Sequence, residues 1–275
     1  MIFKNFEPTE ELKGLVKSYH LRHFEFPPHA KIPSKPFPPR DEQYLNFYVK
    51  GFETIWLQND SKPTIRCRNC IVGQSTRLIQ RVVSPQFLLI QVPFYPGALF
   101  RLTGIPFNEL TDRSIELDLI FPQESREVEQ KLAEARNYLD MIDVVEEFLI
   151  GLHRKNLSKD LKPFDKALPL FFQANQMKMV DVLADQACVS IRQLERLSKE
   201  YFGVGPKTMI RINRFTKSFI VKSRNPQMPW LDVALLCGYE DYQHMAKEYK
   251  DFSGFSPNQL WDADGKAPDR ALGLR

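Results

Sequence analysis

The sequence predicts a two-domain α+β protein: a β-rich N-terminal barrel or sandwich that ends in a helix pair, followed by an all-α C-terminal domain. Up to about residue 122, short runs of β-branched and aromatic residues alternate with Gly, Ser and Pro. From residue 123 onward, apolar residues recur at helical spacings of three and four. With 275 residues, 43% of them hydrophobic, the chain is long enough to build two cores.

Composition shifts set the expected boundaries. Residues 1–154 are expected to form the N-terminal domain, which ends in two helices. Residues 155–163 are rich in lysine and poor in apolar side chains, so they are the expected linker. Residues 164–262 follow as the all-α domain. Residues 263–275, rich in Asp, Gly and Ala, are expected to be a disordered tail.

The strands of the N-terminal domain are expected in short segments bounded by turn residues. Residues 18–24 form an extended run, and the six prolines between positions 27 and 39 exclude regular structure there. The next expected strands are residues 44–49, 53–57, 64–72, 76–83 and 86–92. Short strands at this spacing are typical of a small barrel or sandwich.

Residues 123–153 predict two antiparallel helices after the strands. Asp140 is the expected cap of the second helix, and Glu146 and Glu147 are expected on its exposed polar side. The pair either covers the sheet or forms a homodimer interface, and the two roles are compatible.

The same pattern of residues that begin and end helices occurs twice between residues 179 and 260. Ser190 and Asp241 each precede a run with helical periodicity and are the expected N-caps. Each run then ends in a glycine followed by a proline, at Gly203 and Pro206 and at Gly254 and Pro257. Each copy predicts a short helix, a turn and a longer helix. Two helix-turn-helix units in one stretch indicate a DNA-binding domain whose second helices enter the major groove.

Residues 206–223 form a continuous amphipathic stretch that is expected to join the two units. Its ~17 residues span ~25 Å as a helix, so with the flanking helices the units reach major grooves one turn, ~34 Å, apart. Between Ser190 and Arg224 nine basic residues stand against two acidic ones, although the whole chain carries only +4. This excess is typical of phosphate contacts, and a solvated helix face is the alternative.

The two units resemble the DNA-binding domain of the AraC/XylS family of bacterial transcription regulators. The matching motifs are Ser190-Ile191-Arg192-Gln193-Leu194-Glu195-Arg196 with Gly203-Val204-Gly205-Pro206, and Gly238-Tyr239-Glu240-Asp241-Tyr242-Gln243-His244-Met245 with Phe252-Ser253-Gly254-Phe255-Ser256-Pro257. The resemblance covers residues 162–261. The chain departs from the family at Ser198, where a core aromatic is usual, and at Cys188, which replaces the turn glycine of the first unit.

A weaker resemblance to several AraC subgroups covers residues 73–152, around Phe94-Tyr95-Pro96-Gly97-Ala98. It implies a β-rich, cupin-like regulatory domain. The two resemblances together imply a cytoplasmic bacterial regulator of transcription, with activation and repression both open.

The outward faces of the two recognition helices are expected to read DNA. Base contacts are expected from Arg192, Gln193, Arg196, Tyr242, Gln243 and Lys247. Phosphate contacts are expected from Ser190, Lys199, Lys207, Arg211, Lys250 and Ser256. The alternative for Arg196 is an ion pair within its own helix, with Glu200 or Glu195. His244 is expected to be structural.

No cofactor or metal site is predicted. Cys67 and Cys70 form a lone Cys-x-x-Cys, expected at alternating strand positions, and Cys188 and Cys237 are assigned to the helix-turn-helix cores. Without an apolar run of eighteen residues or a signal peptide, a cytoplasmic protein that does not contact a membrane is expected.

Three functions remain open. The first is a sequence-specific regulator whose N-terminal domain senses a small molecule or forms a homodimer. In the second, that domain binds a protein partner. The third is an enzyme, which needs a convergent polar cluster that the sequence does not reveal, so no enzyme is predicted. A closed pocket lined by Tyr48, Trp56, Phe94 or similar residues favours the first, and a filled barrel favours the second.

Overall fold

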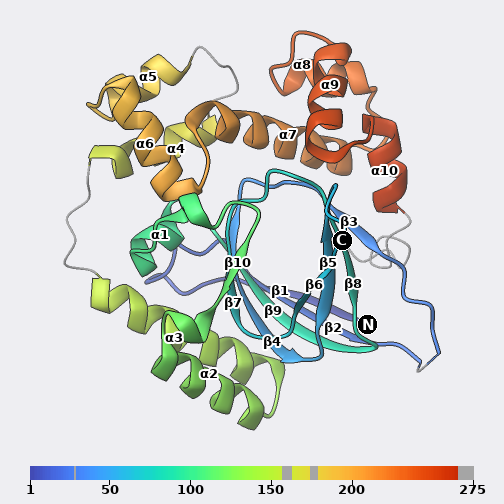
Figure 1. The fold of residues 1–275 in the computed structure, drawn as a ribbon, viewed down its shortest axis with the longest axis vertical. Helices are drawn as coiled ribbons and strands as arrows, with labels where there is room; N and C mark the ends of the chain where they lie inside the picture. Colours follow the sequence, from blue (N-terminus) through green and yellow to red (C-terminus); the bar gives the residue numbers. More distant parts are fainter. Residues whose placement is uncertain (28, 157–162, 174–178, 266–275) are drawn as a thin grey trace.

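The computed structural model describes residues 1–265 except residue 28, residues 157–162 and residues 174–178. Its N-terminal part is built on two antiparallel sheets and its C-terminal part is helical (Figure 1), which confirms the predicted two-domain α+β architecture. Within the described residues, no helix is both long enough and apolar enough to cross a membrane.

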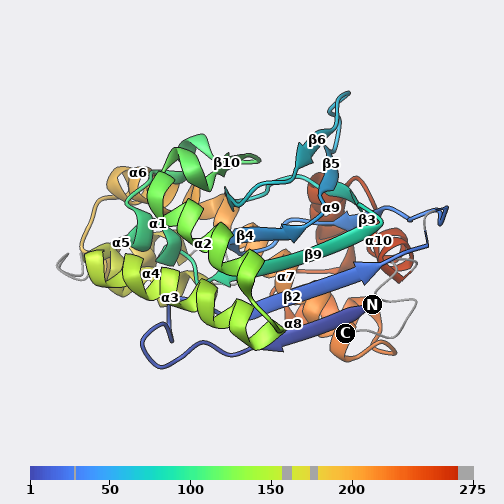
Figure 2. The ribbon, with the colours of Figure 1, turned by 90° about the horizontal axis from the view of Figure 1, so that it is seen from below.

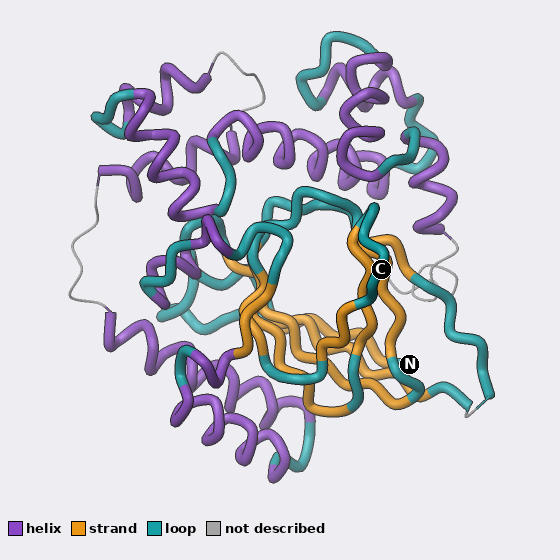
Figure 3. The backbone as a smooth tube through the Cα atoms, viewed as in Figure 1, coloured by secondary structure: helices purple, strands orange, loops and turns teal. Residues whose placement is uncertain are grey.

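The two sheets face each other (Figure 3). The six-stranded sheet has the order β1 (Ile2–Phe6), β2 (Tyr19–Glu25), β9 (Gln86–Phe94), β4 (Gln43–Lys50), β7 (Cys70–Val72) and β10 (Ser114–Glu116). The four-stranded sheet has the order β3 (Lys35–Phe37), β8 (Ile79–Val83), β5 (Glu53–Leu57) and β6 (Thr64–Arg66). Six connections pass from one sheet to the other, and two of them, β4–β5 and β8–β9, are hydrogen-bonded to each other.

Gly51 and Ser84 hold these two connections together. The Ser84 hydroxyl donates to the carbonyl of Gln86 and accepts from the amide of Phe52 at 3.0 Å. A Cβ atom on Gly51, whose φ is +76°, would overlap both the Gln86 carbonyl and the Ser84 hydroxyl. Only glycine therefore fits at the point where one sheet gives way to the other.

The prediction that residues 27–39 lack regular structure was wrong. Lys35, Pro36 and Phe37 form β3, which pairs with β8. β3 is an edge strand, so the missing amide of Pro36 can face away from the ladder without breaking it. The sequence analysis also did not predict β1 and β10. The strand expected at residues 64–72 is divided into β6 and β7.

Helices cover the outer side of the six-stranded sheet (Figure 2). They are α1 (Ala98–Thr103), α2 (Pro122–Glu134) and α3 (Tyr138–Asn156), with 3-10 turns η1 (Phe107–Glu109) and η2 (Leu117–Leu119) between the first two. The ring of Phe148 on α3 packs edge-on against that of Phe47 on β4, with the centroids 5.9 Å apart. The predicted helix pair is confirmed, and its periodic apolar face is buried on the β domain.

Two expectations about α3 were wrong. Asn137, not Asp140, caps the helix, because its side-chain oxygen accepts from the amides of Leu139 and Asp140. Glu146 is not on an exposed face: it is 8% exposed and accepts from the Thr9 amide at 2.7 Å. It ties the N-terminal segment to α3, a role that depends on a residue 137 positions away.

The C-terminal helices are α4 (Pro163–Gln173), α5 (Met179–Gln186), α6 (Ile191–Phe202), α7 (Pro206–Arg224), α8 (Trp230–Leu236), α9 (Tyr242–Ser253) and α10 (Pro257–Gly265). The expected linker falls mostly outside the described residues, and Lys155 at its start belongs to α3. The expected disordered tail begins too early, because α10 continues to Gly265 and Asp264 is 6% exposed.

The first helix-turn-helix unit shares one hydrophobic core with the β domain. The ring of Tyr201, near the end of α6, lies 4.2 Å from that of Phe100 on α1. Gln43 Nε2 donates to the Tyr201 carbonyl at 3.0 Å, and Thr111 Oγ1 donates to the Gly203 carbonyl at 2.6 Å. The C-terminal end of α6 is therefore fixed to the β domain.

Candidate nucleic-acid interface

The recognition helices α6 and α9 stand at opposite ends of α7 (Figure 1). Ser190 caps α6: its hydroxyl accepts from the Gln193 amide, and the Gln193 side chain accepts from the Ser190 amide. Asp241 caps α9 by accepting from the His244 amide at 2.7 Å. Both predicted caps are confirmed, and they fix the N-terminal turn of each helix, which is the part that meets base edges in such domains.

α7 joins the two units as one helix of 19 residues, about 28 Å long. α9 is bound to it by a buried ion pair. Glu248, with 3% of its side chain exposed, accepts from Arg214 Nη2 at 2.8 Å and from Arg211 Nε at 2.9 Å. The guanidinium of Arg214 also stacks on the Tyr239 ring, 4.3 Å from its centroid. These contacts fix the angle between α9 and the connecting helix.

The basic excess of residues 190–224 is not all surface charge. Arg214 and Lys222 are 4% and 8% exposed, and the Lys222 ammonium donates to the carbonyls of Pro226 and Met228 at 2.7 Å. Arg211 is bound to Glu248 and Asp251, which outweigh the opposing effect of burial and raise its pKa. Sequence counting therefore overestimates the charge that faces a duplex. The remaining basic residues of the segment are exposed: Arg192, Arg196, Lys199, Lys207, Lys217 and Arg224.

A basic groove marks the outer face of the first unit. It is lined by Val180, Ile191, Arg192, Glu195, Arg196, Lys199 and Lys207. Four of these seven residues are cationic and one is acidic. α6 contributes the arginines and the start of α7 contributes Lys207, so the folded chain brings four of the expected DNA-contacting residues together on one surface.

The second unit exposes Gln243, Lys247 and Lys250 on α9. The Tyr242 ring is half-buried and packs against the core of this unit, so less of it faces outward than the sequence suggested. His244 is half-buried, with its ring edge-on to Tyr239, which is a structural position.

Besides Ser190 and Arg211, four of the expected contact residues already bond within the protein. The Gln193 side chain belongs to the cap of α6. The Ser256 amide donates to the Gln259 side chain at 2.9 Å. Arg196 Nη1 lies 3.2 Å from a Glu200 carboxylate oxygen, and the Lys199 ammonium lies 3.7 Å from Glu195. The Arg196 and Lys199 pairs are exposed and span one turn of helix, so they are weak enough to exchange for DNA.

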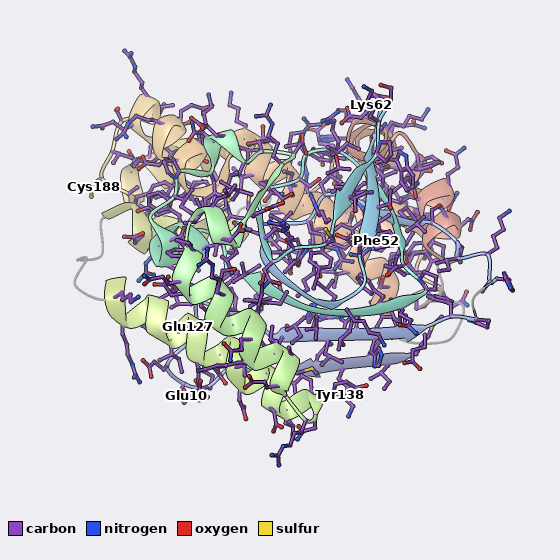
Figure 4. All side chains as sticks on the ribbon, turned by 60° about the horizontal axis from the view of Figure 1, so that its bottom comes forward. Glu10, Phe52, Lys62, Glu127, Tyr138 and Cys188 are labelled. Atoms are coloured by element: carbon purple, nitrogen blue, oxygen red, sulfur yellow. The ribbon has the colours of Figure 1, made fainter. Side chains whose placement is uncertain are left out.

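The turns of the two units have different residues at the position that adopts a positive φ. Cys188 adopts φ +51°, the left-handed conformation that Gly238 adopts at φ +82° in the second unit. Cys188 therefore does occupy the turn-glycine position. It is exposed and its label lies at the edge of the molecule in Figure 4, so its assignment to a core was wrong, whereas Cys237 is fully buried. Ser198 is also fully buried and donates to the Val204 carbonyl at 2.8 Å.

The β domain contains a second candidate site, a cavity of about 230 Å³ between the sheets. Its walls come from both sheets and from α10, the last described helix. Tyr48, Trp56 and Phe94, which the sequence analysis named as candidate lining residues of a closed effector pocket, are not among the described residues that line it. Its aromatic residues are Phe3, Phe24, Phe26, Phe37 and Phe87, and its polar residues are His20, Arg22, Lys35, Arg40, Arg81, Gln91 and Asp264.

A convergent polar cluster that sequence reading missed lies inside the β domain. Gln91 donates to Asn46 at 3.2 Å, Asn46 donates to the Tyr48 hydroxyl at 3.4 Å, and Tyr48 donates to Glu53 at 2.6 Å. Glu53 is 2% exposed and lies 3.8 Å from Arg81. Each of these four residues therefore has a hydrogen-bond partner within the cluster, although Oε2 of Glu53 has none. Such pairing is how buried polar residues are ordinarily stabilised.

Cys67 and Cys70 do not occupy alternating strand positions. Cys67 is exposed before β7, and Cys70 is buried at its start, where burial raises the thiol pKa to about 12. Among the described residues, no three His, Cys, Asp or Glu side chains are grouped as metal ligands.

Comparison with known proteins matches two separate parts of the chain. Residues 183–262 match a family described as a helix-turn-helix domain, and residues 4–116 match a family described as "Domain of unknown function (DUF6597)". The HTH-type transcriptional regulator ArgR of Pseudomonas aeruginosa is 30% identical over 82 residues, which are 29% of this chain and 24% of that protein. The chain thus matches about a quarter of the length of that relative.

The comparison with solved structures gives distant matches, two of which follow. ToxT from Vibrio cholerae O395 is 12% identical, with a TM-score of 0.48, and the alignment covers 92% of this chain and 99% of ToxT. The AraC-like transcriptional activator CuxR is 10% identical, with a TM-score of 0.26 over 86% of this chain and 99% of CuxR. The C-terminal domain, with two helix-turn-helix units on one connecting helix, is thus similar to the helix-turn-helix domain of AraC-type transcription regulators.

Proposed function

We propose that this protein is a sequence-specific DNA-binding regulator of transcription that is controlled by a small molecule bound in its β domain. The main support for DNA binding is the groove of the first unit, where Arg192, Arg196, Lys199 and Lys207 gather on an exposed surface. Arginine can form two bonds to guanine, and lysine neutralises phosphate charge. We assign base contacts to Arg192 and Arg196 and phosphate contacts to Lys199 and Lys207.

The second unit would bind the next major groove along the same face of the duplex. Its exposed α9 residues Gln243 and Lys247 take the base-reading positions, with Tyr242 at their edge, and Lys250 takes a phosphate position. Gln193, Ser190 and Ser256 would contact DNA through groups that the helix caps leave accessible. Arg211 would first have to leave two carboxylates, so a structural role suits its position better.

The observation that favours a small-molecule effector is the cavity between the sheets. This cavity of about 230 Å³ is lined by aromatic and cationic side chains, a combination that can bury the apolar part of a small ligand and bind a polar group on it. The homodimer predicted through residues 123–153 stays a prediction. Burial of the apolar face of α2 and α3 on the β domain accounts for their periodicity without a second copy.

The test of DNA binding starts by selecting bound sequences from a random duplex library with the full chain. Binding to the selected site and to scrambled DNA is then titrated by fluorescence anisotropy at fixed salt. Arg196→Ala should cost about 1–3 kcal/mol on the selected site and relax its base preference. Lys199→Ala should weaken both DNAs alike.

Glu200→Gln is the matched control for Arg196, since it removes the ion pair and keeps the arginine. It should leave affinity for the selected site unchanged or raise it. If Arg196→Ala binds the selected site as tightly as the unaltered protein, the docking of α6 in the major groove is refuted, and the Arg196–Glu200 pair is only a helix-stabilising contact.

A further inference from the structure

Ile191 is an exposed apolar residue at the start of α6. It is the first residue of the helix, directly after the Ser190 cap, and it is 54% exposed. Val189, on the other side of the cap, packs against the core that contains Leu194. An apolar residue in front of the cap is the one that ordinarily fixes the entry of the chain into a helix. Ile191 is therefore not needed for that purpose.

Helix stability does not explain Ile191 either. The first turn of a helix favours acidic residues, because of the helix dipole, and proline, because of its fixed backbone angle. A β-branched side chain instead loses rotamer freedom in a helix. In the second unit the corresponding residue, Tyr242, is the first residue of α9 and packs against the core of its own unit. The same position thus serves the core in one unit and faces outward in the other.

Scattered apolar residues on a protein surface need no function, so the place of Ile191 decides its meaning. Ile191 lines the cationic groove of the first unit together with Arg192 and Arg196. Residues four apart share one face of a helix, so Glu195 and Lys199 continue the same row, and they lie 3.7 Å from each other. Ile191 is the apolar end of a face whose net positive charge complements DNA.

The N-terminal half of α6 is the part that can enter a major groove, because the other end of the helix is buried. Tyr201 and Phe202 are each 1% exposed, and the Tyr201 ring lies 4.2 Å from that of Phe100 in the β domain. Recognition helices of this kind contact base edges with their N-terminal residues. Ile191 stands in this leading turn, beside Arg192.

The major-groove edges of the four bases offer one apolar group, the 5-methyl group of thymine. We propose that Ile191 contacts a thymine methyl group and thereby selects a T·A base pair within the half-site that α6 binds. This inference rests on the proposed function, because it requires α6 to enter the major groove. It adds an apolar determinant of sequence to the arginines, which read hydrogen-bonding groups of guanine.

Replacing thymine by uracil tests the contact without altering the protein. The uracil nucleotide keeps the base pair and its hydrogen-bonding groups and lacks only the methyl group. The half-site of α6 is located in the selected sequence as the positions whose base preference Arg192→Ala relaxes, together with their immediate neighbours. Each thymine there, on either strand, is replaced in turn, and binding is titrated by fluorescence anisotropy at fixed salt. One replacement should weaken binding about fourfold, the effect of exposing one buried methyl group.

A double-mutant cycle assigns the methyl group to Ile191. Ile191→Ala removes the terminal carbons at an exposed position, so it should bind the unmodified site about fourfold less tightly and should not respond to uracil. Sequences selected by this variant should no longer prefer T·A at that position. Val182→Ala is the matched control, since Val182 is 47% exposed on α5 and is not among the described residues that line the groove. It should respond to uracil as the unaltered protein does.

The outcomes separate this contact from DNA binding itself. If Arg192→Ala relaxes a base preference but the half-site has no thymine, or no uracil replacement there weakens binding, the reading of a methyl group is overturned and the docking of α6 stands. An equal response to uracil in Ile191→Ala would assign the methyl group to another residue. If the unaltered protein selects no sequence, or Arg192→Ala changes no preference, the docking of α6 is wrong and this inference fails with it.

Discussion

Replacing Glu248 with glutamine should destabilise the second helix-turn-helix unit more than any other single charge change on α9. Glu248 accepts from Arg214 at 2.8 and 3.3 Å and from Arg211 at 2.9 Å, and both members of the Arg214–Glu248 pair are almost fully buried. Removing one member of a buried pair leaves the other charge uncompensated, which costs about 3–5 kcal/mol. Because Asp251 still holds Arg211, a value near the lower limit, about 3 kcal/mol, is expected.

The measurement is hydrogen exchange of α9 and α8 amides in the full chain, which reports the free energy of opening this unit. Asp251→Asn is the control, because its carboxylate is half exposed and contacts Arg211 at the surface. It should cost no more than about 1 kcal/mol. If Glu248→Gln opens the unit no more readily than Asp251→Asn, the buried pair does not hold α9 on α7. Affinity for the selected DNA site should fall with Glu248→Gln in proportion to the opened fraction.

Three further predictions follow from backbone and protonation states. Cys188→Gly should stabilise the first unit by about 0.5–1 kcal/mol, read from exchange of α5 and α6 amides, because Cys188 is exposed and holds a left-handed conformation. Gly203→Ala should destabilise by about 1–3 kcal/mol in thermal unfolding, because its φ is +85° and the new Cβ would lie 2.8 Å from the Phe107 carbonyl and the Thr111 hydroxyl. The free energy of unfolding should fall as the pH drops from about 6.5 to about 4, and His20 alone should contribute up to about 3 kcal/mol of this loss. In that window the unfolded chain binds a proton that the folded His20, with its pKa lowered by burial and by Arg22, does not.

Each of these three predictions can be contradicted by a specific result. Gly151→Ala on α3 is the control for Gly203, since nothing lies within 4 Å of its new Cβ, and equal effects of the two would remove the argument from close packing. A loss of stability in Cys188→Gly would mean that the turn is not strained. For the histidine, the pH dependence of urea unfolding should flatten between pH 6.5 and 4 in His20→Gln. An unaltered slope would mean that other groups set it.

The helix-turn-helix units were predictable because their signals are local. Ser190 and Asp241 sit within three residues of the amides they cap, and the glycines that end α6 and α9 follow from the same short-range geometry. The periodicity of residues 206–223 predicts α7 because a helix repeats its face every three to four residues. None of these features depends on a distant partner.

The sequence analysis misjudged the burial of side chains whose partners lie far away in the sequence. Arg214 and Lys222 look like surface charges in a basic segment. In the structure both are buried: Arg214 pairs with Glu248, 34 positions away, and Lys222 donates to the carbonyls of the turn that follows α7. Glu146 looks like an exposed helix residue in the sequence, but in the structure it accepts a hydrogen bond from the Thr9 amide. Pro36 excludes a strand only if that strand is central, and whether it lies at an edge is a property of the whole sheet.

The amino-acid order alone set the two DNA-reading helices, their caps and the helix between them, because neighbours along the chain make those structures. Tertiary folding decided which charges remain outside. It also brought Asp264 of α10 to the same cavity as Arg40 and Lys35, which lie more than two hundred positions earlier in the sequence. Contacts across such separations depend on how strands and helices pack, and a linear pattern of residues carries no record of that packing.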